Sequence, residues 1–214
     1  SNNNNSNSNN NKQPTATTTT EDVPQRKRAH LAVLQDRFAS PAQVENAVTC
    51  LQAEGFLCTP KDYTVAITSL GRKGSTWHAA SLLESMVQYG PWPNAFHFNA
   101  AISACDASGQ WEYALMLLDR MQCLGIPPDA ISFNAAISVC GKQGHWARSM
   151  DLLWQMQGLG IYPTVVSFGA AIDACARGGQ WQSALGLLEG MPSAGLAVNV
   201  VSANAALGSL SKAG

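Results

Sequence analysis

The amino-acid sequence predicts an all-α fold, a right-handed α-solenoid of repeated helix–turn–helix units. The strongest observation is a period of 35 residues, at which tryptophan recurs at Trp111, Trp146 and Trp181. The same spacing relates four methionines and four glycines: Met86, Met121, Met156 and Met191, and Gly90, Gly125, Gly160 and Gly195. A fixed period of roughly 20–50 residues is the mark of a repeat array. Charged residues make up 13% of the chain, below the usual share of about 25%, which fits stacked helices covered on both faces.

The N-terminal segment 1–24 has a different composition and is expected to be disordered. It is rich in Asn and Thr and contains no aromatic residue and no leucine. Such a segment cannot bury enough apolar surface to offset the entropy lost on folding. Because residue 1 is Ser rather than Met, we also expect the natural N-terminus, with any targeting peptide, to lie further upstream.

Residues 25–59 are interpreted as a degenerate repeat or an N-terminal cap of the array. Four residues at helical spacing predict its first helix: His30, Leu31, Leu34 and Phe38. The second helix is expected to open with Ser40 as N-cap and Pro41 at the first helical position. It should end near Gly55, in a left-handed C-terminal cap.

Residues 60–214 form the regular array. Its units are 60–94, 95–129, 130–164 and 165–199, followed by a truncated unit at 200–214. Each unit should contain two helices that end near glycines, joined to the next unit by a loop that usually contains proline. The polar residues expected to cap the first helices are Asp62, His97, Ser132, Ser167 and Ser202. The alanines expected to let neighbouring helices approach closely are Ala66, Ala101, Ala136, Ala171 and Ala206.

The cysteines indicate packing rather than metal binding. Cys105, Cys140 and Cys175 share one position of the repeat, no CxxC motif occurs, and the four histidines are scattered. Zinc needs closely spaced pairs of ligands, so we expect buried apolar thiols, no metal site and no cofactor. The longest apolar runs are far shorter than the roughly 20 residues of a membrane span, so no membrane contact is expected.

Two polar positions recur in the repeats without an obvious packing role. One lies in the first turn of the first helix and is occupied by Thr64, Asn99, Asn134, Gly169 and Asn204. The other closes the repeat and is occupied by Asn94, Asp129, Thr164 and Asn199. We expect both on the concave face, which the first helices of a superhelix line. The alternative is that they cap helices and form turns, which suits the closing position better than an Asn inside a helix.

The repeat follows the pattern F-N-A-x-I-x-x-C-x-x-x-G-x-W-x-x-A-L-x-L-L-x-x-M-x-x-x-G-I-x-P-D, clearest from Phe98 to Met121. This pattern resembles the pentatricopeptide repeat (PPR) family in its 35-residue P type. The resemblance covers about residues 60–212, with a faint extension back to residue 26. The tetratricopeptide repeat (TPR) has a period of about 34 residues, and the F-N and P-D dipeptides also favour the PPR family.

The resemblance implies sequence-selective binding of single-stranded RNA, one nucleotide per repeat. In the family, the first-turn and closing residues of a repeat read the base. The pairs here are Thr64 with Asn94, Asn99 with Asp129, Asn134 with Thr164, and Gly169 with Asn199. Asn204 is the corresponding first-turn reader of the truncated unit. The residues that would sandwich the bases are Phe96, Ile131 and Val166, whereas Lys61 departs from the apolar norm. The residues that would meet the phosphates are Arg72, Lys142 and Arg177, with Ala107 interrupting the series beside Asp106.

The resemblance also implies a base order, with the N-terminal repeats toward the 5′ end of the RNA. The first pair matches the family's adenine combination and the second its uracil combination. The third pair keeps the pyrimidine-favouring Asn134, while Gly169 has no side chain with which to read a base. The expected core is therefore 5′-A-U-Y-N.

Charge and motifs narrow the remaining classes of function. The net charge is −1 and the pI about 6.4, whereas nucleic-acid-binding domains often exceed a pI of about 9. Residues 60–199 carry seven Lys or Arg and nine Asp or Glu, which argues against strong phosphate binding. No paired carboxylates, recurrent catalytic set or Walker motif occurs, so we expect the chain not to be an enzyme.

Two alternatives stay open. One is a peptide-binding scaffold of the TPR kind, and the other is an RNA-processing enzyme whose catalytic domain lies beyond residue 214. By family resemblance we expect a chloroplast or mitochondrial protein that serves RNA processing, stability, editing or translation. Its expected partners are single-stranded RNA and other RNA-processing proteins, with no small-molecule substrate.

Overall fold

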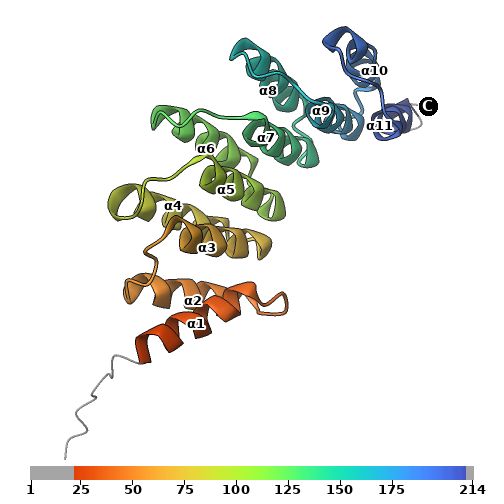
Figure 1. The fold of residues 1–214 in the computed structure, drawn as a ribbon. Coiled ribbons are helices and arrows are strands. Elements are labelled where there is room, and N and C mark those ends of the chain that lie inside the picture. The colour runs from red at the N-terminus through yellow and green to blue at the C-terminus, as the bar shows by residue number, and fades with distance from the viewer. Residues whose placement is uncertain (1–21, 211–214) are drawn as a thin grey trace, which may run out of the picture.

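The computed structural model describes residues 22–210, which fold into helices joined by short loops (Figure 1). The helices are α1 (Asp22–Gln35), α2 (Pro41–Ala53), α3 (Pro60–Arg72), α4 (Thr76–Tyr89), α5 (Ala95–Ser108), α6 (Trp111–Cys123), α7 (Ala130–Lys142), α8 (Trp146–Gly158), α9 (Val165–Arg177), α10 (Trp181–Gly190) and α11 (Val200–Leu210). A 3₁₀ turn, η1 (Pro192–Ala194), follows α10. The successive helix pairs confirm the predicted α-solenoid.

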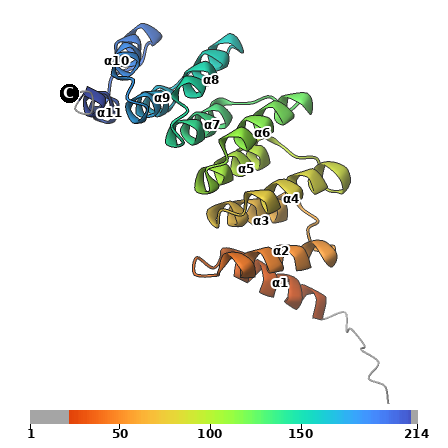
Figure 2. The same ribbon diagram turned by 180° about the vertical axis from the view of Figure 1, so that it is seen from behind.

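The helices form two layers along a curved row. Each odd-numbered helix contacts the next odd-numbered one, from α1 against α3 to α9 against α11. Each even-numbered helix packs against the odd-numbered helices before and after it. The row bends so that the odd-numbered helices lie on its inner side and the even-numbered helices on its outer side (Figures 1 and 2). We call the exposed surface of the odd-numbered helices the inner face.

Apolar columns with the repeat period form the core between the two layers. Phe98 and Phe133 from the odd-numbered layer are fully buried, and so are Leu118 and Met121 from the even-numbered layer. The alanines predicted to allow close packing are all buried: Ala66, Ala101, Ala136, Ala171 and Ala206. Burying one large apolar side chain stabilises a fold by about 1.5–3 kcal/mol. The repeated columns therefore determine which face of each helix is covered.

Two glycines bring successive odd-numbered helices into close contact. A Cβ atom on Gly71 of α3 would lie 2.7 Å from the Cβ of Ala104 in α5. A Cβ atom on Gly141 of α7 would lie 2.6 Å from the Cβ of Ala174 in α9. Both distances are shorter than van der Waals contact, so any larger side chain at either position would push the two helices apart.

The first helices begin earlier than predicted, because the closing residue of the preceding repeat is the cap. The observed N-caps are Thr59, Asn94, Asp129 and Thr164, and Asn199 makes the same bonds before α11. The predicted caps Asp62, His97, Ser132, Ser167 and Ser202 are wrong as caps. They lie at the third helical position and bond back to the cap backbone, which completes a capping box. Both positions carry residue types that can cap a helix, and the extended backbone of the closing residue decides between them.

The N-terminal pair agrees with the prediction except at its edges. Ser40 caps α2 with Pro41 at the first helical position, and Gly55 adopts a left-handed φ of 69°. Phe38, predicted to lie on the first helix, instead lies beyond its end and is 95% exposed. Its N–H donates to the Asp36 carboxylate in the turn that follows α1. Residues 22–24, predicted to be disordered, are the first turn of α1. Residues 1–21 lie outside the described residues.

Gly90 departs from the glycines that share its repeat position. Gly125, Gly160 and Gly195 have φ between 70° and 74°, whereas Gly90 has a φ of −97° and a ψ of −170°. Pro91 follows it directly, and a proline forces the preceding residue into an extended conformation. The return loop from α4 to α5 therefore starts differently from the others.

The three cysteines that share a repeat position are buried, as predicted. Desolvation raises the pKa of Cys105 to about 12 and the pKa values of Cys140 and Cys175 to about 11, so these thiols stay protonated at neutral pH. Among the described residues, no helix is both long and apolar enough to cross a membrane. Within residues 22–210, no three His, Cys, Asp or Glu side chains gather into a group suited to a metal ion.

Candidate functional site

A row of exposed apolar side chains runs along the inner face. Phe96, Ile131 and Val166 are the second residues of α5, α7 and α9, and they are 63%, 63% and 64% exposed. The structure therefore leaves all three predicted sandwiching residues uncovered by protein. Val201 of α11 continues the row and is also exposed. Val201 was not among the predicted sandwiching residues, although it follows Val166 at the 35-residue repeat period.

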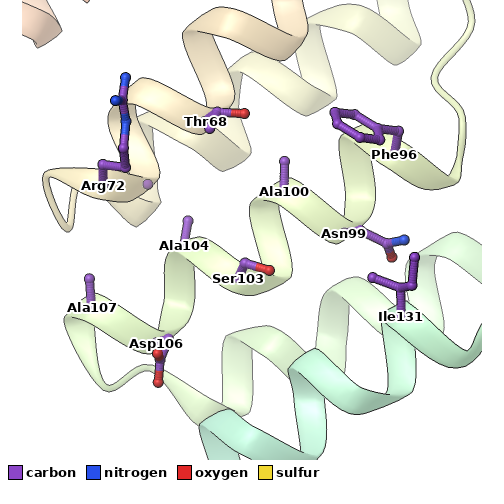
Figure 3. Close-up of a pocket in the computed structure, with 11 residues that line it drawn as sticks. Thr68, Arg72, Phe96, Asn99, Ala100, Ser103, Ala104, Asp106, Ala107 and Ile131 are labelled. Atoms are coloured by element: carbon purple, nitrogen blue, oxygen red, sulfur yellow. The ribbon is translucent and has the colours of Figure 1, made fainter. Parts of the chain in front are cut away.

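The pocket between α3, α5 and α7 brings several of the predicted residues together. It has a volume of about 480 Å³. Phe96, Asn99 and Ile131 lie at one end of it, and Arg72 and Asp106 lie toward the other (Figure 3). Its remaining lining side chains are small or polar: Thr68, Gly71, Ala100, Ser103, Ala104 and Ala107. The small side chains make the hollow, and their contribution was not predicted.

The second reading pair, Asn99 and Asp129, is joined by a hydrogen bond. The Nδ2 of Asn99 donates to Oδ1 of Asp129 at 3.2 Å, and the hydroxyl of Ser132 lies 2.6 Å from Oδ1 of Asn99. Partial burial alone would raise the pKa of Asp129. Hydrogen bonds from Ser132, Asn99 and the backbone outweigh burial and lower that pKa, so the carboxylate is ionised at neutral pH.

The first reading pair is arranged differently. The Thr64 hydroxyl donates to the backbone oxygen of Pro60 at 3.0 Å, whereas the Asn94 side chain accepts from the N–H groups of Phe96 and His97. His97 is buried; its Nδ1 accepts from the Asn94 N–H, and its Nε2 lies 3.0 Å from the oxygen of Pro60. Asn94 therefore uses its side-chain oxygen as a cap, which leaves its amide NH₂ as the group available to a ligand.

Asn134 of the third pair and both residues of the fourth pair, Gly169 and Asn199, line a second hollow of about 350 Å³. Val166 also lines it, whereas Thr164 does not. The Oδ1 of Asn134 is buried and makes no hydrogen bond. A Cβ atom on Gly169 would meet nothing within 4 Å, so this position is open space. The next first-turn residue, Asn204, is exposed at the edge of a further hollow that Arg177 also lines.

The three predicted phosphate-binding residues all make internal contacts. Nη2 of Arg72 donates to the backbone oxygen of Leu34 and to Oγ of Ser69, both at 3.1 Å. The other two pair with carboxylates: Lys142 with Asp106, at 2.5 Å, and Arg177 with Asp173, at 2.8 Å. Lys142 and Arg177 are therefore partly neutralised on the inner face, whereas both partners of Arg72 are uncharged. The pairing of Lys142 with the preceding repeat was not predicted.

The comparisons with known proteins agree with this architecture. The family model for the pentatricopeptide repeat domain matches residues 62–143, and the PPR repeat model matches residues 131–161 and 166–196. The comparison with curated proteins gives no match.

Among solved structures, the chain is similar to the pentatricopeptide repeat protein PPR10 from maize, with a TM-score of 0.67 and 24% identity, over 85% of this chain and 26% of that one. It is similar to PPR10 in complex with an 18-nt psaJ RNA element, with a TM-score of 0.62 and 22% identity, over 89% and 32% of the two chains. It is also similar to the PPR domain of Arabidopsis thaliana protein-only RNase P 1 in complex with tRNA, with a TM-score of 0.53 and 17% identity. This match covers 69% of this chain and 84% of that one.

The chain thus spans about a third or less of the PPR10 chains, and these identities support a shared fold. The family models cover most of the regular units, in which the 35-residue period, the paired helices and the exposed apolar row of the inner face all occur. The chain belongs to the pentatricopeptide repeat family.

Proposed function

We propose that this protein binds single-stranded RNA along its inner face and reads one base per repeat. The observation that carries the proposal is the hydrogen-bonded pair Asn99 and Asp129, which lies beside the exposed side chains of Phe96 and Ile131. A hydrogen-bonding pair next to exposed apolar side chains suits a nucleobase, which has a polar edge and two apolar faces. Two similar proteins solved in complex with RNA, PPR10 and the PPR domain of RNase P 1, support the same class of ligand.

The apolar row would hold the faces of the bases. Phe96 and Ile131 come from successive repeats and both line the 480 Å³ pocket, so a base between them would contact one side chain on each face. Stacking of a base on an aromatic side chain contributes about 1–3 kcal/mol and is insensitive to the identity of the base. The row would therefore supply affinity, whereas the polar pairs would supply discrimination.

The chemistry of the second pair favours uracil. Asn99 Nδ2 keeps one N–H after donating to Asp129, and the ionised Asp129 keeps a second oxygen as an acceptor. One donor beside one acceptor complements the O4 and N3–H edge of uracil. Cytosine presents an amino donor and an N3 acceptor at these places, so each of its groups would meet one of the same kind.

The remaining pairs complete the proposed 5′-A-U-Y-N core. Adenine opposite Thr64 and Asn94 rests on the family resemblance. A pyrimidine opposite Asn134 also rests on the family resemblance, because the Oδ1 of Asn134 is buried and out of reach of a base. The open space at Gly169 would accept any base. In the cell we propose a reader, rather than an enzyme, that serves processing, stability, editing or translation of chloroplast or mitochondrial RNA.

Fluorescence anisotropy with short single-stranded RNAs tests the proposal directly. RNAs that carry the 5′-A-U-Y-N core should bind more tightly than RNAs in which the second base is C, A or G. Equal binding of all four RNAs would refute base reading at the second repeat. Binding of peptide pools in place of RNA would favour the scaffold alternative.

A further inference from the structure

Ser132 links the second reading pair to the following repeat. It is the third residue of α7 and is fully buried. Its Oγ lies 2.6 Å from Oδ1 of Asn99, which comes from α5. Its backbone N–H donates to Oδ1 of Asp129 at 2.8 Å, and the Asp129 N–H lies 3.2 Å from the Ser132 hydroxyl. One side chain thus contacts both predicted readers.

The single hydroxyl proton of Ser132 has a preferred acceptor. Oδ1 of Asn99 lies at 2.6 Å, Oδ1 of Asp129 at 2.9 Å and the sulfur of Met121 at 3.7 Å. The carboxylate oxygen already accepts from the Ser132 N–H and from Asn99 Nδ2, and a thioether is a weak acceptor. The proton therefore goes to Asn99, whose oxygen is the nearest of the three acceptors.

These bonds determine the orientation of the Asn99 carboxamide. Its NH₂ must face the Asp129 carboxylate, because an oxygen there would be repelled, and its oxygen must face the Ser132 hydroxyl. Asn99 is 8% exposed, so water does not provide ready substitutes for either partner. The bonds leave one N–H of Asn99 in a defined direction toward a ligand.

The equivalent residues in the neighbouring repeats make no such bond. Ser167 has the same position in α9, but its hydroxyl bonds to Thr164, and Oδ1 of Asn134 makes no hydrogen bond. In the second unit His97 has this position and bonds to Asn94 and Pro60 rather than to Thr64. Among the described repeats, the bond to a first-turn reader occurs only at Ser132.

We propose that Ser132 is a positioning residue that sets base discrimination at the second nucleotide, so that reading of this base by Asn99 and Asp129 depends on a residue of the next repeat. The inference rests on the proposed RNA-binding function and deepens it. Without the hydroxyl, Asn99 would lose the partner of its buried oxygen and its remaining N–H would no longer have one direction. Discrimination would then fall at this nucleotide and at no other.

The test compares Ser132→Ala with Ser167→Ala in the full 214-residue chain. Each substitution removes the hydroxyl that bonds to the N–H of its cap residue, Asp129 or Thr164, so loss of a capping box is common to both. Only Ser132→Ala also removes a bond to a first-turn reader. Thermal melts establish that both variants are folded before they are compared.

The first readout needs no RNA. In protein labelled with ¹⁵N at asparagine, the side-chain NH₂ of Asn99 is assigned as the signal that disappears in Asn99→Ser, and its heteronuclear NOE reports mobility. We expect a rigid NH₂ in the unmodified protein and in Ser167→Ala, and a mobile one in Ser132→Ala. An NH₂ that stays equally rigid in Ser132→Ala overturns the inference whatever the RNA result.

The second readout is the preference for U over C at the second nucleotide. Ser132→Ala should lower it by about 5- to 10-fold, the factor expected for one hydrogen bond, while Ser167→Ala leaves it unchanged. A mobile Asn99 with an unchanged preference overturns the inference and leaves the proposed function standing. No preference in the unmodified protein overturns the proposed function, and the inference with it.

A gain of function gives an independent check should Ser132→Ala fail to fold. Thr164→Asp places a carboxylate beside Asn134 and Ser167, as Asp129 lies beside Asn99 and Ser132, and Asp is a good N-cap. It should create a preference for U over C at the third nucleotide, and Ser167→Ala in that background should lower this preference by about 5- to 10-fold. A preference that survives Ser167→Ala contradicts a positioning role for the serine.

Discussion

The side-chain amide of Asn99 donates to the carboxylate of Asp129 across 3.2 Å, although the two residues lie at opposite ends of one repeat. Asn99 is the fifth residue of α5, one turn from its start, and Asp129 caps α7. The packing of α5 against α7 brings these two helix starts together. The pair is thus held by the stacking of two repeats, and it provides the most specific prediction about this protein.

The double substitution Asn99→Thr and Asp129→Asn should change the preferred second base from U to A. It copies the first reading pair, Thr64 and Asn94, into the second repeat, and Asn is also a good N-cap, so α7 should keep its start. We expect a change in discrimination of about 1–3 kcal/mol, the scale of a bidentate base contact in DNA. Competition binding with the U and A forms of one RNA measures it. A double variant that still prefers U would refute the reading role of both residues.

Lys142→Ala should weaken binding of all RNAs about equally, because a phosphate contact carries no base information. The slope of log K against log salt should become flatter by about 0.7, because the variant neutralises one phosphate fewer on a single strand. Arg148→Ala is the matched control, since Arg148 is an exposed cation on α8 in the outer layer. Equal changes in slope for the two variants would show that Lys142 acts only through net charge.

Asp106→Asn should strengthen RNA binding without changing base preference. Asp106 lines the 480 Å³ pocket and neutralises Lys142, so its carboxylate competes with phosphate for that cation. Asp119→Asn on α6 changes the net charge by the same amount on the outer layer. If titrations give the same affinity for both variants, competition at Lys142 is not the cause.

Leu118→Ala should lower the free energy of unfolding by roughly 2–5 kcal/mol, the range for truncating a buried leucine. Leu118 is 1% exposed and lies in the column between the layers. Urea denaturation followed by circular dichroism measures the change. A decrease below half a kilocalorie, roughly the effect of a surface substitution, would contradict the core assignment.

The cysteines should divide into two classes toward alkylation of the native protein at pH 8. Cys50, Cys58 and Cys123 are exposed and should react, whereas the three buried cysteines, with pKa values raised to about 11 or 12, should not. Mass spectrometry should find three labels before denaturation and six after it. Labelling of Cys140 in the native protein would show that α7 opens readily.

The architecture and most of the core follow from the sequence alone. The 35-residue period identifies each repeat, and the apolar stripe at helical spacing within each helix predicts the face that is buried. The alanines, the shared cysteines and the exposed row of Phe96, Ile131 and Val166 all lie as their positions in the repeat indicate. The end of α2 at Gly55 also agrees, because a left-handed cap is a local preference of glycine.

Only the tertiary structure decided which polar groups meet. Lys142 pairs with Asp106, and Ser132 bonds to Asn99, in both cases across two successive repeats. Ser132 looked like a cap from its sequence, and only its position against α5 shows a second partner. Hydrophobic burial depends on which face a residue occupies, and the period reveals that face. A hydrogen bond depends on distances of a few tenths of an ångström between separate repeats, which are set by how closely their helices stack.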